Sequence, residues 1–364
     1  MGRDSNSNSP DKRNRTASGN SPVPDDLGPT IEPGLIDGVE STVAPQRIAG
    51  LIERIKLSAD QLADDGTSRG DLKILSRTLR ELRHAFKTFS PYRSSRKVTV
   101  FGSARTAPEA PAYRQAVEFG QAMAAHDWLV VTGAAQGIME AGHVGAGREH
   151  SMGLNILLPF EQSSNAVIAG DSKLVHMKYF FTRKLMFVKE SNAICLLPGG
   201  FGTLDEGLEV LTLLQTGKRD MVPVVFLDEP GGSYWTTFLD FVEKQLLGQG
   251  YIDAQDRFLY KLTDRVDEAV DEILQFFRVY HSMRYVHEKL VMRLTERPDE
   301  ALLDAINTEF ADLLSSGRFT VEGPLPEEKD EVDLIDLCRL VFHFNRRDSG
   351  RLRCLIDCLN RGHV

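Results

Sequence analysis

The chain has 364 residues, of which 41% are hydrophobic and 26% charged, an ordinary composition that favours one large α/β domain with appendages. Its formal net charge of −9 argues against general nucleic-acid binding, because proteins that bind nucleic acid usually show a basic balance. No run of 18 apolar residues occurs and the first residues lack the apolar core of a secretory signal, so we expect a cytoplasmic protein without a membrane partner.

Residues that could bind a metal are scattered along the chain. Cys195, Cys338, Cys354 and Cys358 show no Cys-x-x-Cys spacing, so we expect buried thiols; the alternative is a zinc site, which no His-x-x-x-His pattern nearby supports. The nine histidines form no H-E-x-x-H motif. We therefore expect neither a metal nor another cofactor.

The N-terminal part divides into a polar segment and two helices. Residues 1–44 are rich in Ser, Asn, Pro, Asp and Gly, and we expect a disordered tail there because such a segment cannot bury enough apolar surface. In residues 45–92, apolar side chains recur at spacings of three and four, which predicts two amphipathic helices. Their apolar faces either pack against the main domain or form a subunit contact. The residues of these faces are Ile48, Leu51, Ile55, Leu62, Leu72, Leu75, Leu79, Leu82, Phe86 and Phe89.

Residues 93–280 alternate short apolar runs with longer amphipathic stretches. The runs "KVTVF", "WLVVT", "GLNILL", "AICLL" and "VVFL" are typical of strands, and helical patterns separate them. The apolar runs are unbroken, as expected for strands that are covered on both faces. The pattern predicts a Rossmann-like, doubly wound parallel sheet.

Residues 281–364 have a different pattern. Three strands ("EKLVMRL", "GRFTVEGPL", "CRLVFHFN") and two helices in the order β-α-β-β-α suggest a small α+β domain, ferredoxin-like or ACT-like. Its apolar residues must be covered by the chain's own helices or by a partner. A regulatory or subunit-contact role and a passive structural cap are both left open. The apolar residues in question are Leu290, Met292, Leu294, Val341, Phe342 and Phe344.

Three glycine-rich segments follow predicted strands, at 101–105 ("FGSAR"), 132–140 ("TGAAQGIME") and 198–206 ("PGGFGTLDE"). In a doubly wound sheet, ligands bind beyond the carboxyl ends of the strands. In the third segment the glycines let the backbone approach a ligand, and the N-terminus of the following helix can bind an anion. Thr203 either caps this helix or binds a phosphate oxygen. Three such segments in one sheet favour a ligand site over plain β–α turns.

Glu206 is the last residue of the third segment and lies in the first turn of a predicted helix over 204–217. A carboxylate in the first turn is favoured by the helix dipole, which is a structural reason for its presence. Beside a phosphate site, however, it would repel the ligand. Its presence makes chemical sense if positive charge develops in the reaction, as at the anomeric carbon of a sugar. A carboxylate there could stabilise that charge or orient the attacking water.

"PGGFGTLDE" resembles the P-G-G-x-G-T-x-x-E motif of the Lonely Guy phosphoribohydrolases, and "TRKLM" is similar to that family's Arg-Lys segment. Arg183 and Glu206 are 23 residues apart, as the family pattern expects, and the resemblance, to the longer bacterial branch, covers roughly residues 97–277. It implies hydrolysis of a nucleoside 5′-monophosphate, AMP or a cytokinin riboside monophosphate, to the free base and ribose 5-phosphate. Separately from the resemblance, we expect a homo-oligomer, a dimer or a higher assembly. The alternative is a non-catalytic nucleotide or molybdenum-cofactor carrier of the same fold, which would not need the Arg183–Glu206 pair.

The resemblance implies roles for individual residues. Arg183 and Glu206 would be the catalytic pair; since arginine keeps its proton, Arg183 would anchor substrate and stabilise charge. The second loop departs from the family pattern, because Ala134 and Ala135 replace glycines, which puts base selectivity in doubt. We expect His143, on the following helix, to be a packed or solvent-facing histidine. The residues implied to hold the phosphate are Gly199, Gly200, Gly202 and Thr203, and the further substrate-binding candidates are Gly102, Ser103, Arg105, Gly133, Gly137, Met139 and Lys184.

Overall fold

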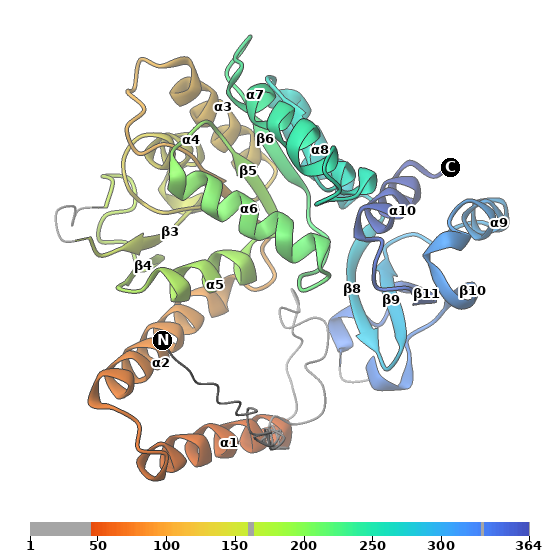
Figure 1. The fold of residues 1–364 in the computed structure, drawn as a ribbon, viewed down its shortest axis with the longest axis horizontal. Helices are drawn as coiled ribbons and strands as arrows, with labels where there is room; N and C mark the ends of the chain where they lie inside the picture. The colour runs from red at the N-terminus through yellow and green to blue at the C-terminus, as the bar shows by residue number, and fades with distance from the viewer. Residues whose placement is uncertain (1–44, 159–163, 329–330, 364) are drawn as a thin grey trace, which may run out of the picture. The chain divides into compact units, whose positions relative to one another are not determined.

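The computed structural model describes residues 45–158, 164–328 and 331–363, so the tail expected for residues 1–44 lies outside the described residues. At the centre is a seven-stranded sheet in the order β4-β3-β2-β1-β5-β6-β7 (Figure 1). Every neighbouring pair of strands is parallel. The predicted Rossmann-like, doubly wound sheet is thus confirmed. Its strands are β1 (Lys97–Phe101), β2 (Leu129–Thr132), β3 (Ser151–Ile156), β4 (Leu174–Met177), β5 (Ala193–Leu196), β6 (Val224–Leu227) and β7 (Lys261–Thr263).

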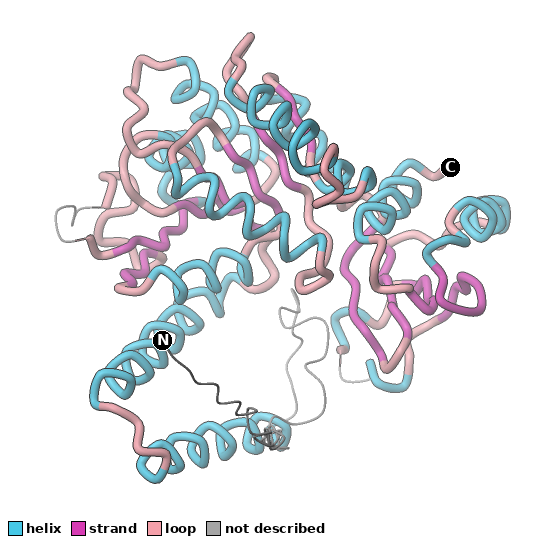
Figure 2. The backbone as a smooth tube through the Cα atoms, in the orientation of Figure 1, coloured by secondary structure: helices cyan, strands magenta, loops and turns pink. Residues whose placement is uncertain are grey.

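Helices cover both faces of this sheet (Figure 2), because alternate strand residues point to opposite sides. Val98 packs in one buried cluster with Ile138 and Ile273, whereas Val131 belongs to a second cluster with Met186. The first cluster draws on α3, α4 and α8, and the second on α5 and α6. The bounds of the helices are α3 (Pro111–Ala125), α4 (Ile138–His150), α5 (Phe180–Glu190), α6 (Phe201–Gln215), α7 (Tyr234–Phe241) and α8 (Val266–Phe276). They are joined by the 3₁₀ helices η1 (Ser90–Tyr92) and η3 (Ala254–Leu259) and the π-helix η2 (Val242–Leu247).

Two helices precede the sheet, α1 (Pro45–Asp64) and α2 (Arg69–Phe89), as the apolar spacing predicts. The second half of α2 packs on the main domain. There the buried Glu81 carboxylate accepts hydrogen bonds from the Lys178 N–H at 2.9 Å and the Thr182 hydroxyl at 2.8 Å. The first half of α2 and the apolar face of α1 do not pack on the main domain. Leu75 on α2 is 46% exposed, and Leu51 on α1 is 52% exposed. Packing against the main domain therefore accounts for only part of the predicted apolar stripe.

The last part of the chain forms an antiparallel sheet in the order β10-β11-β9-β8, with two helices. The predicted α+β character is confirmed. The element order is ββαββα, since β8 precedes the first strand that the sequence predicted, and this differs from the βαββαβ order of ferredoxin-like folds. The elements are β8 (Tyr280–Val286), β9 (Lys289–Leu294), α9 (Glu300–Glu309), η4 (Ala311–Leu313), β10 (Leu314–Glu322), η5 (Pro326–Glu328), η6 (Val332–Leu334), β11 (Cys338–Phe344) and α10 (Ser349–Arg361).

This second sheet buries its apolar residues within the chain. Leu290, Met292 and Phe342 are at most 1% exposed and share one buried cluster with the first sheet, so no partner is needed to cover them. At the end of α10, the Asn360 side chain accepts hydrogen bonds from the N–H groups of Val279 and Tyr280 at 2.9 Å each. The buried amide of Asn360 thereby fixes the connection between the two sheets.

Three general features can be checked on the described residues. The four cysteines are free thiols, two buried and two half-buried. No cluster of three or more His, Cys, Asp or Glu side chains there could hold a metal ion. Nor does any helix in the described ranges have the length and apolar character to cross a bilayer.

Candidate active site

A cavity of about 820 Å³ opens at the carboxyl ends of β1, β2 and β5. Strands β2, β3 and β4 extend the sheet on one side of β1, and β5, β6 and β7 extend it on the other. The place where the strand order reverses is where ligands bind in doubly wound sheets. Eleven of the thirteen predicted site residues line the cavity; Gly137 and Lys184 do not. Those eleven are Gly102, Ser103, Arg105, Gly133, Met139, Arg183, Gly199, Gly200, Gly202, Thr203 and Glu206.

The third glycine loop forms one wall of this cavity at the N-terminus of α6. Gly199 is packed so closely that a Cβ atom would lie 2.2 Å from the Thr203 Oγ1 and 2.9 Å from the Ser103 backbone N. At Gly200 and Gly202, by contrast, an added Cβ would meet no atom within 4 Å. The Tyr234 hydroxyl donates a 2.5 Å hydrogen bond to the Gly199 carbonyl and so holds the loop from behind. The loop therefore presents a fixed backbone and the first N–H groups of α6 to the cavity.

Two expectations about this loop are wrong. The helix begins at Phe201, three residues earlier than predicted, so Glu206 lies in its second turn and the first turn carries no acidic residue. The helix dipole therefore does not explain Glu206, because its effect is confined to the first turn. Gly200 is the N-cap residue and no side chain caps the helix, so Thr203 does not have the capping role. Thr203 instead lies buried in the cavity wall.

Glu206 and Arg183 face each other across the cavity, the carboxylate on α6 and the guanidinium on α5. Their charged atoms are 3.9 Å apart, and Glu206 is only 4% exposed. Burial raises the pKa of Glu206 to about 7, although Lys184 and Arg183 pull it down. Burial lowers the pKa of Arg183, against the effect of Glu206 and Asp205. The site thus holds a carboxylate that changes its charge near neutral pH beside a desolvated cation, a combination typical of functional sites.

Lys184, the other cation of the Arg-Lys segment, has a different position. Its ammonium lies 2.6 Å from Glu209 and 2.9 Å from Asp205, and 3.7 Å from Glu206. It does not line the cavity. Lys184 therefore ties α5 to α6, which keeps Arg183 opposite Glu206; its predicted contact with a substrate stays a prediction.

The second loop is fixed from behind by buried hydrogen bonds. Ala134 adopts a φ of +58°, a left-handed conformation that an alanine rarely adopts, and its N–H donates to Thr132 Oγ1 at 2.9 Å. The buried His143 contacts Thr132 Oγ1 at 3.1 Å and the Met152 carbonyl at 3.0 Å. Burial lowers the pKa of His143 to about 4, so it is a neutral, packed histidine. Asn165 completes the support by donating to the Ala135 carbonyl at 3.1 Å.

Gly137 supports the cavity without lining it. It has a φ of +64°, and a Cβ there would lie 2.3 Å from the Ser103 carbonyl oxygen. The next residue, Ile138, donates its N–H to the same carbonyl at 3.0 Å. Gly137 thus allows the first and second loops to approach each other, which explains its place in the motif without ligand contact.

Several residues that line the cavity were not predicted. Asn155 is a buried polar residue at the end of β3, and its position within the apolar run "GLNILL" is the signal that could have identified it. Phe180 and Phe201, which are 51% and 91% exposed, stand in the wall and give part of it an apolar surface. Large apolar residues outside a buried run carry no comparable signal in the sequence.

The fold and site together define a Rossmann-like protein with a glycine-rich loop at a helix N-terminus and a carboxylate–guanidinium pair beside one cavity. A family model described as "Possible lysine decarboxylase" matches residues 132–273. A rice relative named "Probable cytokinin riboside 5'-monophosphate phosphoribohydrolase" (Oryza sativa subsp. japonica) is 31% identical over 186 residues, covering 49% of this chain and 69% of the relative. An Arabidopsis thaliana cytokinin riboside 5'-monophosphate phosphoribohydrolase is 30% identical over 188 residues, covering 50% of this chain and 83% of the relative. The chain therefore belongs to the Lonely Guy family, as its motifs indicate.

Two solved structures are also similar over half of the chain. The structural-genomics target TM1055 is 25% identical with a TM-score of 0.36, and the match covers 50% of this chain and 99% of that one. The molybdenum cofactor binding protein from Rippkaea orientalis is 17% identical with a TM-score of 0.34, and the match covers 49% of this chain and 94% of that one.

Proposed function

We propose that the chain hydrolyses the N-glycosidic bond of nucleoside 5′-monophosphates, giving the free base and ribose 5-phosphate. The observation that carries this proposal is the Glu206 carboxylate, buried next to Arg183 beside the glycine loop at the N-terminus of α6. A site for phosphate alone would gain nothing from a carboxylate. A site where the anomeric carbon becomes positive would gain charge stabilisation from it.

In this reaction the loop of residues 199–203 holds the 5′-phosphate through backbone N–H groups. The C1′–N bond breaks, the bonding electrons leave with the base, and an oxocarbenium-like centre develops opposite Glu206. The carboxylate stabilises that centre and orients the water whose oxygen bonds to C1′. Glu206 accepts one proton of that water and later releases it to solvent, and the departing base takes up one proton from solvent, so atoms and charge balance. Arg183 anchors the substrate and keeps its own proton.

The relatives named above act, by their names, on a cytokinin riboside 5′-monophosphate, and we propose AMP or such a riboside monophosphate as substrate. The test is incubation with a panel of nucleoside 5′-monophosphates followed by chromatography for free base and ribose 5-phosphate. Release of base from at least one of them is the expected result. A chain that binds AMP and releases no base from any of the panel would be a carrier, which is the alternative interpretation. Amino-acid decarboxylation, named in the family description, has less support, because no lysine is among the described residues that line the cavity.

Removal of the phosphate should nearly abolish activity if the loop binds it. We expect adenosine to be hydrolysed at least a hundredfold less efficiently than AMP, because the N–H groups at the N-terminus of α6 favour an anion. Initial rates for the two compounds at equal concentration, measured as free adenine, give the ratio. Equal rates would show that the loop does not read the phosphate, without deciding against glycosidic cleavage itself.

We also propose that the chain is a homo-oligomer, assembled through the exposed apolar residues of α1 and α2. Leu72, Leu75 and Leu79 lie on one face of α2 and are 40%, 46% and 55% exposed. Exposed apolar patches of this kind mark interaction surfaces. Replacing Leu75 and Leu79 together by glutamate should lower the mass seen by light scattering to that of one chain. Lys73→Glu, on the polar side of the same helix, is the control and should leave the mass unchanged. The same mass for all three proteins would contradict this interface.

A further inference from the structure

A second cavity lies away from the candidate active site, where α5 ends and β8 begins. Its volume is about 40 Å³, and its wall includes Ser191 and Asn192 after α5, the segment 219–222 before β6, and His281 and Ser282 of β8. A single buried water needs roughly 10–15 Å³ on this measure, so the cavity can take a small ion or one phosphoryl group.

Arg219 is the unusual residue in the wall of this cavity. It is 4% exposed, and its Nη2 donates to the Ser191 carbonyl, whereas its Nη1 has no hydrogen-bond partner among the described residues. Burial lowers the pKa of Arg219 to about 10, with Asp220 acting in the opposite direction, so the side chain is still charged at neutral pH. A buried guanidinium N–H without an acceptor is costly, and a ligand oxygen in the cavity would supply one.

Arg96 contributes a second desolvated cation to the same cavity. Its guanidinium lies 3.7 Å from the centre of the Phe277 ring and donates to the His281 carbonyl at 3.4 Å. Within the described ranges it makes no ion pair. Burial lowers its pKa to about 10, so this side chain too is charged at neutral pH.

The other charged groups around the cavity are already paired or neutral. Lys189 pairs with Glu190 at 3.0 Å. Burial and the positive charges of Arg96 and Arg293 lower the pKa of His281 to about 4, so this histidine is neutral. Asp220 is the carboxylate in the wall. Against Arg96 and Arg219 it leaves one positive charge in excess.

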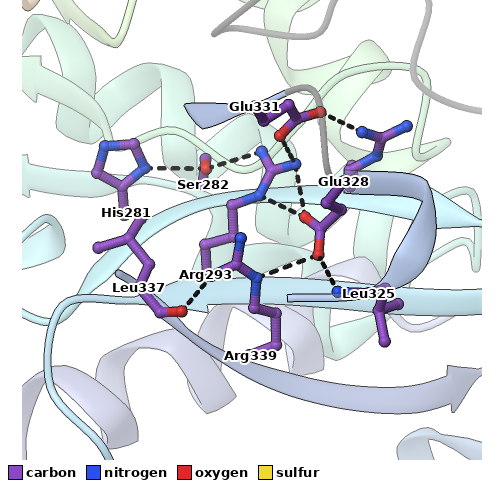
Figure 3. A network of polar contacts seen from close by, with 9 residues as sticks. His281, Ser282, Arg293, Leu325, Glu328, Glu331, Leu337 and Arg339 are labelled. Atoms are coloured by element: carbon purple, nitrogen blue, oxygen red, sulfur yellow. Dashed lines mark hydrogen bonds and ion pairs between the residues drawn. The ribbon is translucent and has the colours of Figure 1, made fainter. Parts of the chain in front are cut away.

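The β8 side of the cavity is held in place by a buried ionic network in the second sheet (Figure 3). Arg293 and Arg339, on neighbouring strands, donate to the two oxygens of Glu328 at 2.8 Å and 3.1 Å. Arg293 also donates to the Ser282 hydroxyl at 3.4 Å, and this hydroxyl lies 2.9 Å from His281 Nδ1. The network therefore fixes Ser282 at the cavity. Its carboxylate pairs with Arg293 and Arg339 and does not neutralise Arg96 or Arg219.

We propose that this cavity binds a phosphate-like oxyanion, with Arg219 and Arg96 as its principal cations and Ser282 as a neutral partner. Guanidinium groups suit phosphate oxygens in both charge and shape. The site also has a connection to catalysis, because α5 carries Arg183 near its start and its end reaches the cavity at Ser191. At 1.5 Å per residue the two positions are about 12 Å apart along one helix. An anion here would fix the end of the helix that positions Arg183 and join it to β8.

The test uses inorganic phosphate and must exclude binding at the active-site loop. Gly200→Asp does this in the full chain, because the added side chain has open space and places a negative charge in the loop. Phosphate binding to this variant, followed by titration calorimetry, should show one remaining site. Adding Arg219→Met, and separately Arg96→Gln, should each weaken that binding at least tenfold. Lys189→Gln removes a paired charge from the same wall and should leave the affinity within about twofold, as for a surface-type ion pair.

Each outcome bears on the proposal and not on the hydrolase reaction. Absence of phosphate binding to Gly200→Asp would overturn it, as would equal loss of affinity in Lys189→Gln and in the two arginine variants. If Arg219→Met does not fold, Arg96→Gln still decides. ADP as a second titrant separates the two sources of such an anion, and only the ADP binding that Gly200→Asp loses on addition of Arg96→Gln is counted, because ADP can also enter the active-site cavity. Tighter binding than inorganic phosphate by this measure indicates the phosphoryl group of a larger molecule, and weaker binding indicates the free ion.

Discussion

Glu206→Gln should lower turnover of a nucleoside 5′-monophosphate at least hundredfold while the chain stays folded. The substitution keeps the shape of the side chain and removes its charge, and the loss of a general base or charge-stabilising group costs roughly 10²–10⁴ in rate. The measurement is base release at saturating substrate. Asp240→Asn is the matched control, because it removes a carboxylate on α7 that is 62% exposed and does not line the cavity. Turnover near the unsubstituted level in Glu206→Gln would remove Glu206 from the mechanism.

The same substitution should increase stability above neutral pH. The pKa of Glu206 is raised from 4.5 to about 7, so the fold favours the neutral acid even with Arg183 and Lys184 nearby. This shift of the pKa does not change the free energy of unfolding below pH 4.5, but it lowers that free energy by on the order of 3 kcal/mol once the pH exceeds 7. Glutamine resembles the neutral acid and escapes this cost. Denaturant unfolding at pH 5 and pH 8 should therefore show the variant gaining stability relative to the parent chain as the pH rises.

With rising pH, activity should change in the opposite direction to stability. Because the proposed mechanism needs the carboxylate, turnover should rise as the pH passes through about 7 and level off above it. A rate profile that falls through pH 7 would assign the protonated acid to catalysis instead. In the expected, rising profile the site gains rate over the pH range in which the fold loses stability, which is the usual relation between buried catalytic charges and folding.

The parallel sheet and the glycine loops follow from patterns that are local in sequence. Unbroken apolar runs identify strands that are covered on both faces, and glycines at strand ends identify turns that approach a ligand. The Arg183–Glu206 pair depended on the family resemblance, since nothing in either residue alone shows that α5 and α6 lie side by side. The structure adds the 3.9 Å distance and the burial that shifts the pKa.

The elements that the sequence did not reveal have weak local signals. β4 has four residues and is interrupted by the exposed His176, and β8 alternates buried residues with His281, Ser282 and Arg284. The helix α6 begins at Phe201, just after Gly199, which packs against Ser103 of a separate loop. The left-handed Ala134 depends on Thr132 and on a histidine from the following helix, and no propensity encodes that arrangement.

Gly199→Ala should damage the wall of the candidate active site through a single added methyl group. The new Cβ would lie 2.2 Å from Thr203 Oγ1 and 2.9 Å from the backbone N of Ser103. The Thr203 side chain can rotate, but the Ser103 backbone belongs to the first loop and is itself bonded to the Pro198 carbonyl at 3.1 Å. The two loops must therefore separate, and overpacking of this kind costs about 1–3 kcal/mol.

Because the same two loops form the proposed phosphate site, we expect Gly199→Ala to reduce kcat/KM for AMP at least hundredfold, as misplacement by about 1 Å does elsewhere. Gly323→Ala, where an added Cβ meets nothing within 4 Å, controls for the change of residue type and should alter neither stability nor rate. Gly202→Ala should leave stability unchanged for the same geometric reason, so comparing its unfolding curve with that of Gly199→Ala isolates the steric effect. If the unfolding curve and the kcat/KM of Gly199→Ala equal those of the parent chain, the two loops are not held together as the distances require. The proposed phosphate site would then lack its rigid backbone.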